Sequence, residues 1–129
     1  MKHTVAAVLA SGALLVMPAC EFIGPEVCTT EAKPSLLITV SDSMTAEPVT
    51  GAGVRVIAST AGFADTVGVN SNGLAVIGHE RAGRFRVQVD APGYFSWVRE
   101  GVRVTADECH VVTADVSAKL RALPVSEGQ

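Results

Sequence analysis

The chain has 129 residues, a formal net charge of −3 at pH 7 and 48% hydrophobic residues. The negative charge disfavours nucleic-acid binding, because proteins of that class normally carry a strong basic excess. Once an export signal is set aside, the length suffices for one domain with a core large enough to fold without a metal or another cofactor.

The first nineteen residues have the pattern of an export signal. The apolar run Val5–Met17 is shorter than the roughly 20 residues that a membrane-spanning helix needs. Ala19 is small and precedes Cys20, so residues 1–19 resemble a bacterial lipoprotein signal peptide, in which the cysteine receives the lipid. Pro18 and the residue before it differ from the small residue and the leucine usual in that signal. The alternative is simple secretion with a free thiol at Cys20.

The cysteine count predicts one lipid site and one disulfide. With Cys20 assigned to the lipid, Cys28 and Cys109 remain, and exported proteins seldom keep free thiols in an oxidising compartment. A bond between them would close a loop of about 80 residues and stabilise the fold by about 4 kcal/mol by the chain-entropy argument. Residues 20–34 are polar, contain Pro25, and are predicted to form a lipidated tether.

Seven short strands are predicted after the tether. Apolar residues recur at every second position and are interrupted by Gly, Pro and Asn, which is typical of strands with one buried face. The expected ranges are 35–42, 54–60, 64–69, 74–78, 83–90, 95–105 and 109–120. The chain is therefore predicted to be all-β, with a seven-stranded antiparallel β-sandwich at residues 35–121 and a flexible tail at residues 122–129.

Three motifs in this region resemble carboxypeptidase regulatory-like domains. Residues 45–54, TAEPVTGAGV, are similar to the opening "TGEPLPGAxV" of that family, and residues 72–76, NGLAV, to its "DGxF" turn. Residues 83–87 and 91–94, GRFRV and APGY, resemble its "GxYxVxVxAxGY" hairpin. The departures are Ala46 for Gly, Asn72 for Asp and Phe85 for Tyr. The resemblance covers residues 35–120 and implies a transthyretin-like sandwich that acts as a stability or interaction module, with no catalytic residues.

The polar residues show no spacing typical of an active site. His79 precedes Glu80 and Cys109 precedes His110, but adjacent strand residues point to opposite faces, so neither pair can chelate one metal ion as it stands. A hydrolase would require His110 to meet a serine such as Ser96, and no nucleophile-elbow motif is present. The protein is therefore interpreted as a non-enzyme without a cofactor.

One sheet face is predicted to be basic and aromatic. Alternation turns two arginines outward on residues 83–90, and two arginines with the only tryptophan outward on the next strand. The predicted face consists of Arg84, Arg86, Trp97, Arg99 and Arg103. Acidic cell-wall polymers, lipid headgroups or an acidic envelope protein would suit such a surface. The alternative is an ordinary solvated sheet face.

The sequence thus predicts a membrane-anchored lipoprotein of the cell envelope that faces the periplasm or the cell exterior. Its sandwich would act as a binding or structural module. A second hypothesis is a carbohydrate-binding accessory domain that uses Tyr94, Phe95 and Trp97 as a stacking platform. A small hydrolase built around His110 is the third.

Overall fold

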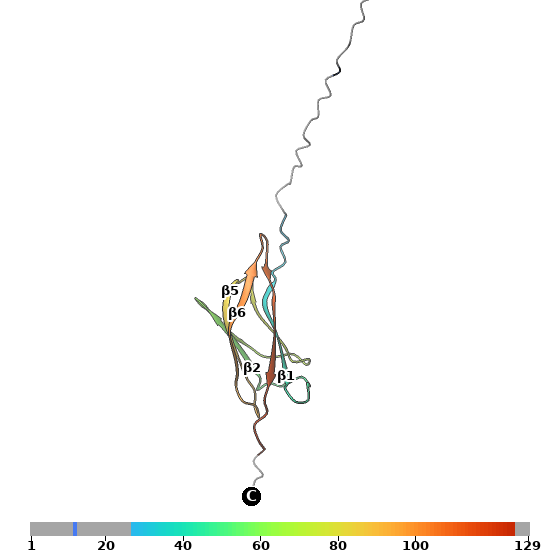
Figure 1. Cartoon of the computed structure of the whole chain (residues 1–129), viewed down its shortest axis with the longest axis vertical. Coiled ribbons are helices and arrows are strands. Elements are labelled where there is room, and N and C mark those ends of the chain that lie inside the picture. The colour runs from blue at the N-terminus through green and yellow to red at the C-terminus, as the bar shows by residue number, and fades with distance from the viewer. Residues whose placement is uncertain (1–11, 13–26, 126–129) are drawn as a thin grey trace, which may run out of the picture.

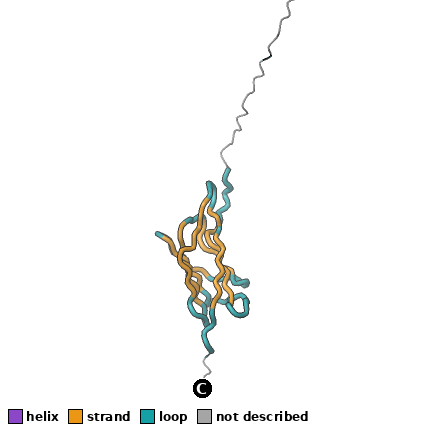
Figure 2. The backbone as a smooth tube through the Cα atoms, in the orientation of Figure 1, coloured by secondary structure: helices purple, strands orange, loops and turns teal. Residues whose placement is uncertain are grey.

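The computed structural model describes residue 12 and residues 27–125, and the strands in it form two packed β-sheets (Figure 1). The first sheet has the order β4-β1-β8, with β1 at Pro34–Asp42, β4 at Leu74–His79 and β8 at Ala114–Leu120. The second sheet has the order β3-β2-β5-β6-β7. Its strands are β2 (Arg55–Thr60), β3 (Phe63–Val67), β5 (Gly83–Asp90), β6 (Trp97–Ala106) and β7 (Val111–Val112). Figure 2 shows that most loops lie at the two ends of the sandwich.

The prediction of an all-β sandwich is confirmed. The predicted count of seven strands is wrong, and so is the fully antiparallel arrangement, because one strand pair is parallel. The described residues form eight strands, because the predicted strand 109–120 divides at Thr113 into β7 and β8. β7 pairs with β6, whereas β8 crosses to the other sheet and lies parallel to β1. The Thr113 hydroxyl donates a hydrogen bond of 2.6 Å to the Pro34 carbonyl at this crossing. One segment therefore contributes to both sheets.

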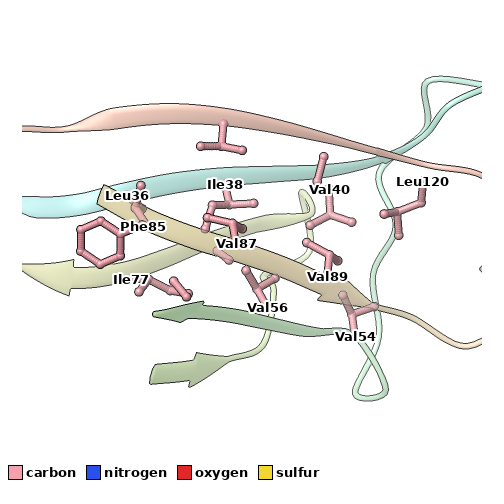
Figure 3. Close-up of a cluster of buried hydrophobic side chains, with 14 of the residues drawn as sticks. Leu36, Ile38, Val40, Val54, Val56, Ile77, Phe85, Val87, Val89 and Leu120 are labelled. Carbon is pink, nitrogen blue, oxygen red and sulfur yellow. The ribbon is translucent and has the colours of Figure 1, made fainter. Parts of the chain in front are cut away.

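Alternate residues of the strands fill the space between the sheets (Figure 3). Fully burying one such aliphatic or aromatic side chain contributes about 1.5–3 kcal/mol. At one end of this core the ring of Phe63 meets that of Phe85 edge to face, with centroids 6.3 Å apart. The buried residues labelled in Figure 3 are Leu36, Ile38, Val40, Val54, Val56, Ile77, Phe85, Val87, Val89 and Leu120.

A β-bulge in β6 changes which side its residues face. Phe85 of β5 lies opposite Val102, and Val87 lies opposite Arg99, so two steps along β5 match three along β6. The extra residue lies beside Gly101, whose φ of 68° is in the left-handed region that glycine adopts most readily. Because side chains alternate along a strand, one extra residue reverses the facing of every residue on one side of the bulge.

The turn before β4 is closed by the Asn70 side chain, as the Asn and Gly residues predicted. Its Oδ1 accepts hydrogen bonds from the N–H groups of Asn72 at 2.9 Å and Leu74 at 3.0 Å. Gly73 has a φ of 75°, and a Cβ atom there would lie 2.6 Å from the Val40 carbonyl oxygen. The turn therefore packs directly against β1 and leaves no room for a larger residue.

Candidate functional site

Cys28 and Cys109 form a disulfide, which confirms the prediction from the cysteine count. Their Cα atoms are 5.1 Å apart although 81 positions separate them in the sequence. Cys109 lies between β6 and β7, and Cys28 lies before β1, where the described chain enters the sandwich (Figure 1). We call this end, made of residues 28–33, 79–82 and 106–111, the proximal end.

The Glu80 carboxylate joins three segments of the proximal end. Its Oε1 accepts a hydrogen bond of 2.7 Å from the Lys33 N–H and lies 2.6 Å from His110 Nδ1, and its Oε2 accepts one of 3.0 Å from the Val111 N–H. The Lys33 N–H is the largest of the contacts that lower the pKa of Glu80, while desolvation opposes them. Glu80 has a positive φ of 54°, a conformation that these contacts hold in place. Sequence reasoning missed this cluster.

His110 also contacts Thr29, with 2.9 Å between Nε2 and the hydroxyl oxygen. Hydroxyl, imidazole and carboxylate follow one another in the order of a hydrolase triad, beside a hollow of about 440 Å³. The serine considered from the sequence, Ser96, is not a partner of His110. Its hydroxyl donates a hydrogen bond to Asp90 instead. Since Glu80 also accepts two backbone N–H bonds, the cluster fastens the entering chain to the sandwich. A site combining His110 with a serine is not formed among the described residues.

The structure divides the predicted basic and aromatic face between the two sides of the five-stranded sheet. Residues directly opposite each other in an antiparallel pair point to the same side. Arg84 lies opposite Arg103 on the outer side, whereas Trp97 and Arg99 lie opposite buried valines of β5 and share their side. The prediction of one continuous face is therefore wrong, because the bulge beside Gly101 reverses the facing of the first part of β6.

Arg86 stays on the outer side but already has partners. Its Nε donates to Glu100 at 2.8 Å and its Nη1 to Gln88 at 3.0 Å. Gln88 in turn donates to Asp90 at 2.8 Å, and the Ser96 hydroxyl donates to the same carboxylate. The Ser96 bond, followed by the Gln88 bond, lowers the pKa of Asp90. This row of side chains leaves the Arg86 charge neutralised by a carboxylate.

Arg84 and Arg103, unlike Arg86, have no acidic partner among the described residues. Both are exposed, and neither forms an ion pair with another described residue. Like charges directly opposite each other on neighbouring strands repel. Of the predicted face, this pair therefore remains as a cationic surface on the outer side of the sheet.

The three rings of the carbohydrate hypothesis do not form a common platform. Tyr94 packs against the core, and its hydroxyl donates a hydrogen bond of 3.0 Å to Asp42. Phe95 is 40% exposed, and the Arg121 guanidinium lies 4.4 Å from the centre of its ring. Trp97 is partly buried against the core. The rings have separate contacts, so the structure gives no support to stacking of a sugar across all three.

Asp42 organises the opposite end of the sandwich, which we call the distal end. Its Oδ1 accepts hydrogen bonds from the N–H groups of Met44 at 2.7 Å and Thr45 at 3.0 Å, and its Oδ2 accepts the Tyr94 hydroxyl. The Met44 N–H, followed by that of Thr45, lowers the pKa of Asp42, and hydrogen bonding to Asp42 raises the pKa of Tyr94. This carboxylate is a structural group.

Residues 27–125 contain no group of three or more His, Cys, Asp and Glu side chains placed to hold a metal ion. Within the same described part of the chain, no helix has the length and apolarity needed to cross a membrane. The predicted signal peptide and Cys20 lie outside the described residues.

Comparison of the sequence with protein families gives a match to a known domain. The carboxypeptidase regulatory-like domain matches residues 35–119. The chain belongs to this family. Domains of the carboxypeptidase regulatory-like family are generally non-catalytic, and the matched residues contain nearly all of the sandwich. Cys28 precedes them, so the disulfide joins the family domain to the chain before it. No curated protein matches the sequence.

Proposed function

We propose that the protein is a lipoprotein of the cell envelope, anchored to a membrane through a lipid on Cys20. Its carboxypeptidase regulatory-like sandwich faces the periplasm or the cell exterior and acts as a non-catalytic binding or structural module. The observation that carries the proposal is the Cys28–Cys109 disulfide. The chain has three cysteines, so the disulfide leaves Cys20 without an intramolecular partner. An apolar run that ends in Ala19 precedes that cysteine, as in lipoprotein signals.

The contacts of the proximal end support an anchoring role for the chain that enters there. Cys28 is bonded to the segment between β6 and β7, and Lys33 hydrogen-bonds to Glu80 beyond β4. These strands belong to different sheets. A pull on the tether would therefore be transmitted to both sheets instead of peeling β1 from the sandwich.

The experiment is fractionation of cells that express the Cys20→Ser variant. We expect the parent protein in the membrane fraction and the variant in the soluble fraction, because one lipid-bearing residue provides the anchor. The matched control is the double variant Cys28→Ser with Cys109→Ser, which loses two thiols but keeps Cys20 and should stay with the membrane. Retention of Cys20→Ser after a carbonate wash would contradict the proposal.

A further inference from the structure

We propose that Arg81, Arg84 and Arg103 form a site for phosphate groups of anionic phospholipid headgroups. The membrane concerned is the one that holds the lipid anchor, so this inference rests on the proposed function. The site would hold the sandwich against the membrane surface and give the tethered domain a defined orientation.

A hollow at the proximal end has a lining rich in arginine. It measures about 600 Å³, and Arg81, Arg84 and the Thr60 side chain are among the residues that line it. Glu80 is the only acidic residue in its lining. Both oxygens of that carboxylate accept hydrogen bonds from backbone N–H groups outside the hollow. Two arginines therefore line the hollow with one carboxylate that is directed elsewhere, and the Arg81 guanidinium also lies 4.5 Å from the centre of the Phe63 ring.

Two arginines face each other across β5 and β6 without a neutralising charge from any described residue. Arg103 lies directly opposite Arg84, and neither has a carboxylate partner among the described residues. By contrast, Arg86, two residues further along β5, has its charge neutralised by an ion pair with Glu100 at 2.8 Å. A phosphate has several acceptor oxygens and can receive hydrogen bonds from two guanidinium groups at once, which would relieve the repulsion between them.

The hollow lies at the end of the sandwich where the described chain enters. The hollow and the one beside Thr29 and Cys109 share Glu80 and Ala82, so the arginines lie next to the point where the chain enters. The eight residue-to-residue steps from Cys20 to Cys28 span at most about 29 Å when fully extended. A lipid on Cys20 would therefore keep this end of the sandwich near the headgroups.

Acidic residues define which side can meet the membrane. Glu108 is exposed at the tip between β6 and β7, close to Asp107, so an end-on contact with an anionic surface would be repelled. The Asp107 carboxylate accepts hydrogen bonds of 2.8 Å from the N–H groups of Cys109 and His110. The outer side of the five-stranded sheet, with Arg84 and Arg103, is the side that would face the headgroups.

The test uses the chain from residue 20 onward carrying Cys20→Ser, so that neither a lipid nor the apolar run Val5–Met17 contributes to binding. Its sedimentation with phosphatidylcholine vesicles is compared with that on vesicles containing phosphatidylglycerol, at low salt. We expect association with the anionic vesicles only, and its loss at high salt. Adding Arg81→Gln, Arg84→Gln and Arg103→Gln should weaken it at least tenfold, since each arginine near an anionic surface contributes about fivefold.

The matched control adds Arg55→Gln, Arg99→Gln and Arg121→Gln, three exposed arginines that neither line the hollow nor lie opposite Arg84. It removes the same charge and should change binding by less than about threefold. If vesicle binding weakens equally in both triple variants, the effect comes from net charge alone and the proposed site is contradicted. If the first triple variant fails to fold by circular dichroism, the single change Arg103→Gln, at an exposed strand position, should still weaken binding about fivefold.

Free phosphate is the other source of the same chemistry. Titration with inorganic phosphate, followed by amide chemical shifts near Gly83, measures it directly. Phosphate binding that requires the arginines, without any vesicle association, would assign the hollow to a soluble anion and overturn the lipid proposal. Lipidation is measured separately by fractionation of Cys20→Ser, so failure of either proposal is distinguishable from failure of the other.

Discussion

The two ends of the sandwich are each organised by one carboxylate, but their partners lie at very different distances along the chain. At the distal end, Asp42 binds N–H groups two and three residues further on, and Tyr94 is its one remote partner. At the proximal end, Glu80 binds Lys33, His110 and Val111, which lie 47, 30 and 31 positions away.

This difference shows how each end is held. A carboxylate that bonds to the next few residues forms a turn that the local chain can close by itself. A carboxylate whose partners are remote forms its contacts only after the sheets have assembled, and the ordering of those segments costs conformational entropy. The disulfide at Cys28 and Cys109 limits that cost at the proximal end. The proximal end is therefore the cross-linked end, and the distal end depends on turn geometry.

Removing the cross-link should have the largest effect. The double variant Cys28→Ser with Cys109→Ser should lower the free energy of unfolding by about 4 kcal/mol, since the bond closes a loop across 81 sequence positions. Denaturant unfolding measures the change. A reductant should lower the stability of the parent by a similar amount and leave the double variant unaffected. A loss below about 1 kcal/mol would mean that the proximal end holds without the disulfide.

Glycine replacement tests the dependence of the distal end on turn geometry. Gly73 and Gly101 have φ values of 75° and 68°, but only at Gly73 would a Cβ atom approach another atom closely, at 2.6 Å. Gly101→Ala should cost about 1 kcal/mol, the penalty for alanine in this conformation. Gly73→Ala should cost about 3 kcal/mol, because β1 must also move. Thermal unfolding of both variants compares them, and equal losses would contradict the packing argument.

Acid titration should give the smallest effect and compares the two carboxylates directly. Contacts lower the pKa of both Glu80 and Asp42. Each therefore contributes stability that is fully present above the ordinary carboxyl pKa of about 4 and is lost as the pH falls through the lowered pKa. Glu80→Gln and Asp42→Asn should each be less stable than the parent at pH 7, and the differences should shrink in acid.

Salt distinguishes the two variants further. Of the two carboxylates, only Glu80 faces an ionisable base, His110, so the effect of Glu80→Gln should depend more strongly on ionic strength. Urea unfolding at several pH values and salt concentrations provides the measurement. A stability of Glu80→Gln equal to that of the parent at neutral pH would show that the cluster does not hold the entering chain.

The sequence predicts what alternation and local turns determine. The alternation along residues 83–90 correctly predicted which residues of β5 face outward, and the motif at residues 72–76 correctly predicted a turn. The disulfide followed from counting cysteines in an exported chain. These features depend on neighbouring residues or on cellular redox chemistry, so one sequence is sufficient to find them.

The bulge was harder to predict because its effect depends on the partner strand. A glycine within a strand is compatible with a bulge, but the sequence does not tell how β5 and β6 align on either side of Gly101. Simple alternation places Trp97 outward and its neighbour Val98 inward, but Val98 is 45% exposed and Trp97 is partly buried. The strand crossing at Thr113 leaves only a weak signal in the sequence. The buried residue before it, Val111, is odd-numbered, whereas the buried residues of β8 are even-numbered, so the alternation shifts by one residue at the crossing.

The Glu80 cluster had no local signal at all. His110 and Glu80 are 30 positions apart, and no sequence pattern links them. Their contact depends on the order of strands in both sheets, which alternation does not determine. The proximal end could therefore be predicted at its disulfide but not at its hydrogen bonds.

The central claim is that Cys20 carries a lipid while the other two cysteines are bonded to each other. Mass spectrometry of the membrane-purified protein, digested without reductant, measures both features in one sample. The account predicts an N-terminal peptide that begins at an acylated Cys20, together with a linked pair of peptides containing Cys28 and Cys109. An unmodified Cys20, or a disulfide between Cys20 and either of the other cysteines, would contradict it.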